Sequence, residues 1–324
     1  MTENKHNNKF EESVTAFSHI NIKGDADENR RAMLPSLIIR SVIIAICIGL
    51  LGYAMFMIAM SSIETDEANE FYGNLRPDAN ESPVKPSSPL LEPADMLNLR
   101  DAFNADGQND VYNDMLGNSA TDSQRRSSYY RNFISRRLKY PDMYAWIYVN
   151  FTDIDYPVMK GPYTNYYLGH TIDGTPSSYG SITAESTLSD IYTANMNNVI
   201  YGHCMKNGTM FRSLKTFMES ANRNTKAKSM NIEIYTEEGL YIYKVLSGYR
   251  NDDNHYAQTV FNTTAEYKQF LDKIVSRNEL SVSNSYDENS RIVTLITCAN
   301  LTSNDDERYI LHGVLTAFIP KEQL

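Results

Sequence analysis

A run of 20 residues without a charged side chain, residues 41–60, constrains this 324-residue chain more than any other feature. As an α-helix rising about 1.5 Å per residue, the run would span roughly 30 Å, the thickness of the hydrocarbon core of a bilayer. A buried helix in a protein core is the alternative, but an uncharged run of this length disfavours it. The sequence therefore predicts one membrane-spanning helix whose partner is the lipid bilayer.

The charges on either side of this run predict its orientation. Basic residues precede it and acidic residues follow it: Lys23, Arg30, Arg31 and Arg40 before, and Glu64, Asp66, Glu67 and Glu70 after. Because basic residues favour the cytoplasmic side, residues 1–40 are expected to form a cytoplasmic tail, with everything after residue 60 outside the cell. A cleaved signal peptide is the competing interpretation, but the long N-terminal region and the lack of a clear A-x-A site favour an uncleaved, single-pass anchor.

The rest of the chain divides into three parts. Residues 61–110 are acidic and contain five of the eleven prolines, a composition that predicts an extended extracellular linker. Residues 111–139 carry apolar residues at partly helical spacing and are expected to form an N-terminal helical segment. Residues 140–324 are expected to fold as one domain, because the 23 Tyr and 12 Phe of the chain can supply a substantial core.

The expected domain is mainly β. Short β-branched and aromatic segments separated by turn residues are typical of strands in a closed barrel or a sandwich. Eight such segments are apparent, at residues 144–149, 154–159, 180–183, 199–201, 232–235, 240–249, 292–297 and 309–318. Residues 264–277 break this pattern, because their apolar residues recur at three- and four-residue spacing, which predicts an amphipathic helix.

The last two predicted strands carry a reactive pair of side chains. Cys298 directly follows residues 292–297, a polar stretch of nine residues comes next, and Arg308 then opens the final strand. An antiparallel hairpin would put Cys298 and Arg308 at the same end of neighbouring strands. The guanidinium would favour the thiolate and could hold a developing oxyanion. Alone, Cys298 would more often be a small buried apolar residue.

A nucleophilic cysteine also needs a proton-transfer partner, and His203 is the best placed of the six histidines. It follows a short apolar strand and Gly202, and a polar turn with Gly208 comes after it. His312 lies among apolar residues of the last strand, where a structural role is expected. Cys204, directly after His203, is either a harmless replacement or a partner for a reversible disulfide with Cys298.

These motifs resemble the class B sortases. TLITC followed ten residues later by Arg308 is similar to the cysteine-to-arginine signature of sortases, and YGHCMKNGTMF, residues 201–211, resembles the histidine motif of class B. Trp146, IDYPV, YYL and GSI occur upstream in the order that class B members show. The similarity covers residues 140–319. Two departures are Cys204 and the segment GSITAE, residues 180–185, which lacks the Phe-x-Asp ending of relatives.

The resemblance implies a fold and an activity. The fold is a sortase-type closed β-barrel of about eight strands, with N-terminal helices and one helix before the cysteine strand, so residues 140–324 would be the catalytic domain. The activity is that of a membrane-anchored cysteine transpeptidase, in which Cys298 forms a thioester with a sorting signal of a secreted protein. His203 would transfer protons, Arg308 would hold the oxyanion, and Thr297 would contact substrate. The acceptor would be an amine of peptidoglycan or of its lipid-linked precursor.

Composition and motifs exclude other classes of function. The formal net charge of −10 disfavours a nucleic-acid partner. The absence of CxxC and HExxH spacings gives no reason to expect a metal, and no cofactor is expected. The alternatives left open are a membrane-tethered cysteine endopeptidase that hydrolyses its substrate, a pilin-linking sortase, and a non-catalytic binding module on the same fold.

Overall fold

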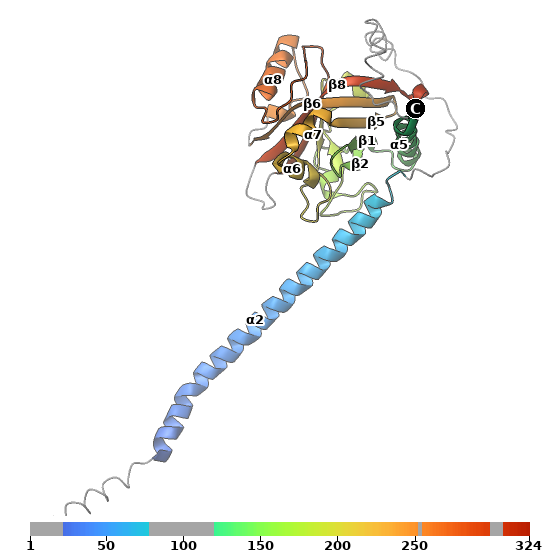
Figure 1. Cartoon of the computed structure of the whole chain (residues 1–324). Helices are drawn as coiled ribbons and strands as arrows, with labels where there is room; N and C mark the ends of the chain where they lie inside the picture. The colour runs from blue at the N-terminus through green and yellow to red at the C-terminus, as the bar shows by residue number, and fades with distance from the viewer. Residues whose placement is uncertain (1–21, 78–119, 252–254, 299–306) are drawn as a thin grey trace, which may run out of the picture. The chain divides into compact units, whose positions relative to one another are not determined.

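The computed structural model describes residues 22–77, 120–251, 255–298 and 307–324 of the chain (Figure 1). The chain divides into two compact units, Met1–Glu64 and Thr65–Leu324. The described part of the first unit is the N-terminal part of helix α2, Ile22–Gly73. Residues 38–60 of this helix are long and apolar enough to cross a membrane, and their side chains are exposed.

Helix α2 corrects one expectation, because residues 61–73 are helical rather than extended. The sequence explains the continuation, since no glycine or proline interrupts residues 53–72 and several alanine and glutamate residues favour a helix. Gly73 ends the helix, and Pro77 follows. The remainder of the expected linker, residues 78–110, lies outside the described residues.

Eight strands of the second unit close into a barrel in the order β1-β2-β3-β4-β7-β8-β6-β5. This confirms the predicted barrel and excludes the open sandwich. The pairs β2–β3 and β4–β7 are parallel, and the other pairs are antiparallel. The strand bounds are β1 Met143–Val149, β2 Asp155–Met159, β3 Ile182–Ala184, β4 Asn197–Tyr201, β5 Asn231–Thr236, β6 Gly239–Asn251, β7 Ile292–Cys298 and β8 Arg308–Pro320.

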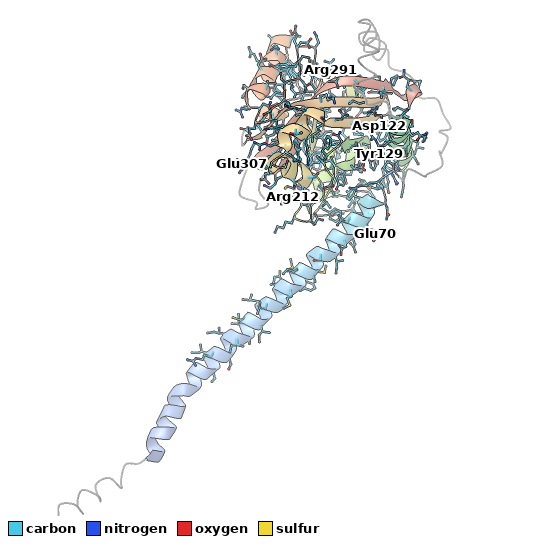
Figure 2. The ribbon with its side chains drawn as sticks, viewed as in Figure 1. Glu70, Asp122, Tyr129, Arg212, Arg291 and Glu307 are labelled. Atoms are coloured by element: carbon cyan, nitrogen blue, oxygen red, sulfur yellow. The ribbon has the colours of Figure 1, made fainter. Side chains whose placement is uncertain are left out.

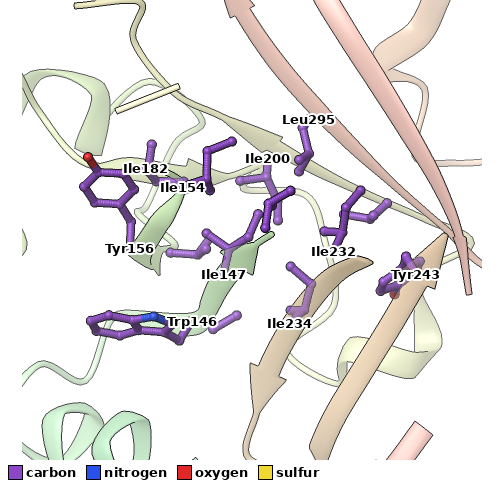
Figure 3. Packing of buried hydrophobic residues seen from close by; sticks show 14 of the residues in the cluster. Trp146, Ile147, Ile154, Tyr156, Ile182, Ile200, Ile232, Ile234, Tyr243 and Leu295 are labelled. Atoms are coloured by element: carbon purple, nitrogen blue, oxygen red, sulfur yellow. The ribbon is translucent and has the colours of Figure 1, made fainter. Parts of the chain in front are cut away.

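Two hydrophobic clusters stabilise the barrel from its two faces. The larger cluster fills the barrel and includes Ile147, Ile234 and Leu295 (Figure 3). The smaller cluster joins the other face of β4, β7, β8 and β6 to helix α8, Thr264–Ser276, through residues such as Leu271. Because strand side chains alternate between faces, neighbouring residues of β7 belong to different clusters. Helix α8 is the amphipathic helix predicted before the cysteine strand.

Further helices surround the barrel. Helix α5, Ala120–Lys139, contacts β1 and β5 and falls within the expected helical segment, whose residues 111–119 lie outside the described part of the chain. Two short helices, α6 Arg212–Glu219 and α7 Arg223–Ser229, were not predicted. Single 3₁₀ turns complete the fold: η1 Tyr167–Gly169, η2 Tyr192–Ala194, η3 His255–Ala257 and η4 Lys321–Gln323.

A buried carboxylate attaches α5 to the barrel. Glu233 of β5 is 1% exposed and accepts two hydrogen bonds from Arg125, at 2.9 and 2.8 Å. Arg126 lies 3.4 Å from the same carboxylate, and the Tyr235 hydroxyl donates to it at 2.7 Å. Tyr129 of the same helix (Figure 2) donates to Asp155 of β2. A buried charge that has all its partners is tolerated, but removing one member leaves the others desolvated and unpaired.

We expect Glu233→Gln to lower the free energy of unfolding by about 3 kcal/mol, because Arg125 and the buried Arg126 would lose the buried carboxylate that both contact. Urea denaturation of the detergent-solubilised chain would measure this through Trp146, the single tryptophan, which is buried. Glu237→Gln is the matched control. Its carboxylate pairs with Arg137 at the surface, so its effect should stay below about 1 kcal/mol. Equal effects of the two variants would contradict the assignment.

Candidate active site

The site is built on β7, which lies between β4 and β8. Cys298, the last residue of β7, pairs directly with Arg308, the first residue of β8. On the other side, Ile296 pairs with Tyr201, the last residue of the parallel strand β4, and the Gly202 amide donates to the Ile296 carbonyl at 3.1 Å. His203 follows the end of β4 by two residues, and Cys298 follows Ile296 by two residues on the neighbouring strand. Cys298 and Arg308 are therefore paired, and His203 lies just beyond the end of the strand next to them.

The side chains of Cys298 and Thr297 lie on opposite faces of β7, because strand side chains alternate between faces. Ile296 belongs to the cluster under α8, whereas Leu295 belongs to the barrel interior. Cys298 therefore continues the outer face and is half-buried, and Thr297 continues the inner face. Thr297 is 2% exposed, and its Oγ1 has no hydrogen-bond partner among the described residues. A substrate contact by Thr297, as expected from the sequence, would therefore be made through its backbone.

The His203 ring is held by a backbone carbonyl. Its Nε2 lies 2.8 Å from the carbonyl oxygen of Leu168 in the turn η1. A carbonyl can only accept, so Nε2 carries the proton in this contact, and Nδ1 is the ring nitrogen that does not face Leu168. Gly202 lets the chain approach its neighbours here, because a Cβ would lie 2.5 Å from Ile182 and 2.6 Å from Phe211. Leu168 ends the YYL motif noted in the sequence, but nothing in that motif indicated a contact with a histidine 35 positions later.

Arg308 of β8 lies beside Cys298, on the side of β7 opposite β4, and charged side chains surround it. Its Nη1 donates to the backbone carbonyl of Glu307 at 3.0 Å, while the Glu307 carboxylate forms an ion pair with Arg250 of β6. The arrangement leaves the half-buried Arg308 level with the thiol of Cys298. The rest of the predicted loop, residues 299–306, lies outside the described residues.

Cys204 is a buried thiol with a partner of its own. Arg212, at the start of α6, donates from Nη1 to its Sγ at 3.6 Å. Burial raises the pKa of the Cys204 thiol above its ordinary value of 9.0, and the neighbouring Cys298 adds to the rise. Both thiols are free in this structure. A harmless replacement at Cys204 is the interpretation that the sequence favoured, and the reversible disulfide with Cys298 stays a proposal.

Glu185 and Tyr201 form a polar contact that sequence reasoning missed. The Tyr201 hydroxyl donates to Glu185 at 3.1 Å, and Thr164 donates to the same carboxylate. Burial, and then the Glu185 charge, raises the pKa of Tyr201. Tyr201 lies two residues before His203, so this contact is next to the candidate site. The departure from the family pattern at residues 180–185 was the available signal. Among the described residues, no group of three or more His, Cys, Asp or Glu could hold a metal ion.

Comparison with known proteins agrees with this geometry. The family model for the sortase domain matches residues 147–316. Sortase B of Listeria monocytogenes is 26% identical over 177 residues, which cover 54% of this chain and 70% of the relative. Sortase B of Staphylococcus aureus is 27% identical over 171 residues, which cover 52% of this chain and 68% of the relative. The crystal structure of Clostridium perfringens sortase B is 27% identical with a TM-score of 0.51, covering 57% of this chain and 99% of that one. The S. aureus sortase B structure is 25% identical with a TM-score of 0.53, covering 59% and 89%.

The chain therefore belongs to the sortase family and, within it, to class B. Enzymes of this family are transpeptidases, and the closed eight-stranded barrel described above is the fold of the sortase B structures.

We expect an alkylating reagent to label Cys298 well before Cys204 at neutral pH, because Cys298 is half-buried while burial keeps Cys204 in its thiol form. Labelling of Cys204 should rise only as the pH passes its raised pKa. Peptide mass spectrometry of the native, detergent-solubilised chain would measure both rates. Labelling after mild oxidation with hydrogen peroxide tests the disulfide proposal, since a disulfide would protect both thiols together and unequal protection would contradict it.

Proposed function

We propose that this chain is a membrane-anchored class B sortase that cleaves a sorting signal in secreted proteins through a thioester on Cys298. The observation that supports this most directly is the direct pairing of Cys298 with Arg308, with His203 two residues beyond the end of the neighbouring strand β4. A nucleophile, a proton donor and acceptor, and a fixed cation are the groups that acyl transfer requires.

The first proposed step is acylation. The Cys298 thiolate attacks a backbone carbonyl carbon of the sorting signal, and a carbon–sulfur bond forms. The carbon–nitrogen bond then breaks, and His203 gives a proton to the departing amine nitrogen. In the second step an incoming amine attacks the thioester carbon, His203 accepts the proton of that amine, and the Cys298 sulfur leaves as thiolate. The bonds and protons balance over the two steps, so the enzyme returns to its starting state.

Arg308 has the geometry to stabilise charge in both steps. A guanidinium is always protonated and carries five donors in a planar fork, so it can hold the carbonyl oxygen as that oxygen becomes negative. Its backbone pairing with Cys298 fixes it to the same pair of strands as the nucleophile. Removing one donor from an oxyanion site typically lowers kcat by about 10²–10³-fold.

The proposed substrates are secreted proteins that carry a C-terminal sorting signal. The proposed acceptor is an amine of peptidoglycan or of its lipid-linked precursor, which would attach the secreted protein to the cell wall. Hydrolysis of the same thioester by water is the competing outcome. A pilin-linking sortase, in which the acceptor amine belongs to a pilin subunit, is a variant of the transpeptidase. Transfer to an amine gives an amide, whereas hydrolysis gives an acid.

We expect the full chain in detergent to cleave quenched peptides bearing LPxTG-, NPxTN- or PPxTG-like signals and to form an amide when an amine is added. Cys298→Ala should abolish cleavage, because the neighbouring thiol, Cys204, is buried and its raised pKa keeps it protonated. Arg308→Lys should lower kcat by about 10²-fold, because a lysine keeps the charge but loses the planar fork. Arg250→Lys, which changes a neighbouring arginine paired with Glu307, is the matched control. Cleavage to acid alone in the presence of amine would contradict the transpeptidase and indicate a hydrolase.

The proposed location is the cell membrane, with the N-terminus in the cytoplasm and the catalytic domain outside. The apolar part of α2 and the basic residues before it support this orientation.

We expect protease added to intact protoplasts to digest the catalytic domain and to spare an epitope placed at residue 1. Immunoblotting with antibodies to each end would measure this, and permeabilised protoplasts, in which both ends are accessible, serve as the control. Loss of the N-terminal epitope from intact protoplasts would contradict the orientation.

A further inference from the structure

The end of α2 and the residues just after it pack against the catalytic barrel within the second unit. Tyr72 is 4% exposed and Leu75 is 5% exposed, and both belong to the core cluster of the barrel. The Tyr72 ring makes edge contacts with Tyr156 and Tyr179, at centroid distances of 5.9 and 6.3 Å. Arg76 lies 3.8 Å from the half-buried carboxylate of Asp155. This segment, residues 72–76, is therefore part of the folded domain rather than of a spacer.

The Tyr72 hydroxyl is bonded to the segment that precedes β3. It donates to the Gly180 carbonyl at 2.7 Å and lies 2.9 Å from the Ser181 hydroxyl. Ser181 is in turn bonded to η1 and the residue after it, because its amide donates to the Tyr167 carbonyl at 2.7 Å and its hydroxyl donates to the His170 carbonyl at 2.9 Å. The Tyr72 hydroxyl is thus hydrogen-bonded to Gly180 and Ser181, and Ser181 is hydrogen-bonded to η1 and to His170.

The turn η1 carries the carbonyl that binds the candidate catalytic histidine. Leu168 lies between Tyr167 and His170, and its carbonyl oxygen is the partner of His203 Nε2 at 2.8 Å. Gly180 packs directly on this carbonyl, since a Cβ at Gly180 would lie only 2.1 Å from the Leu168 oxygen. Gly180 also has a φ of +52°, a conformation that glycine adopts without strain. A shift of Gly180 would therefore displace the oxygen that orients His203.

We propose that Tyr72 is a positioning residue for catalysis: through Gly180 and Ser181 it fixes the Leu168 carbonyl, and through that carbonyl it fixes the orientation of His203. This inference rests on the proposed role of His203 in proton transfer. It makes the segment that follows the candidate membrane span a component of the active site. The ring of Tyr72 belongs to the core, so the positioning role is assigned to its hydroxyl alone.

The test compares Tyr72→Phe with the wild-type full chain in detergent. Tyr72→Phe keeps the buried ring and removes only the hydroxyl. We expect kcat for peptide cleavage to fall about three- to tenfold, the size of one neutral hydrogen bond, with KM within about twofold. We also expect ¹⁵N-NMR of the histidine-labelled chain to show a smaller share of the Nε2–H tautomer at His203, which a purely structural loss would not produce.

Tyr179→Phe is the matched control, because the Tyr179 ring packs against Tyr72 and its hydroxyl makes no hydrogen bond to Gly180 or Ser181 among the described residues. It should keep the wild-type kcat and the wild-type tautomer. Wild-type values in Tyr72→Phe, or equal losses in both variants, would overturn the inference. If the wild-type chain cleaves no peptide and matches Cys298→Ala, the proposed function fails instead, and the tautomer at His203 still decides whether Tyr72 positions the ring.

Discussion

The pairing of β7 with a strand on each side is the constraint on which the rest of the site depends. β4 runs parallel to it and β8 antiparallel, so the C-terminal ends of β4 and β7 and the N-terminal end of β8 meet at one edge of the barrel. Three strands from separate parts of the sequence thus end at the same edge. A slip of one residue in β7 would turn Cys298 into the barrel interior, because strand side chains alternate between faces.

A buried polar network holds this register. Thr294 of β7 donates to Asn197 of β4 at 2.7 Å and lies 2.8 Å from Nδ1 of His312 on β8. The other ring nitrogen of His312 lies 3.0 Å from the Tyr249 hydroxyl of β6. These four side chains connect four neighbouring strands, and a slip in any one of them would leave buried polar atoms without partners. The network explains why the last strand carries a histidine among apolar residues.

The sequence predicted where the strands lie along the chain, but not which strands pair with each other. All eight predicted strands exist, since alternation and β-branched residues mark each of them locally. Alternation says which face is buried and nothing about which strand lies beside it, so the parallel pairing of β4 with β7 came only from the structure. Helices α6 and α7 were missed because each spans about two turns, too short for a periodic pattern to stand out. The predicted extended linker was wrong over residues 61–73, where a pattern of acidic residues also suited a helix.

By itself the sequence determined the apolar span, the presence of a β-domain, and the choice of Cys298, His203 and Arg308 as candidate residues, because each depends on residue type and local spacing. The tertiary structure decided how these residues are supported. The Leu168 carbonyl that holds His203 and the Tyr72 hydroxyl that reaches Gly180 are contacts between segments 35 and 108 positions apart. Such contacts depend on how the chain packs around the barrel, and no local pattern of residues encodes them.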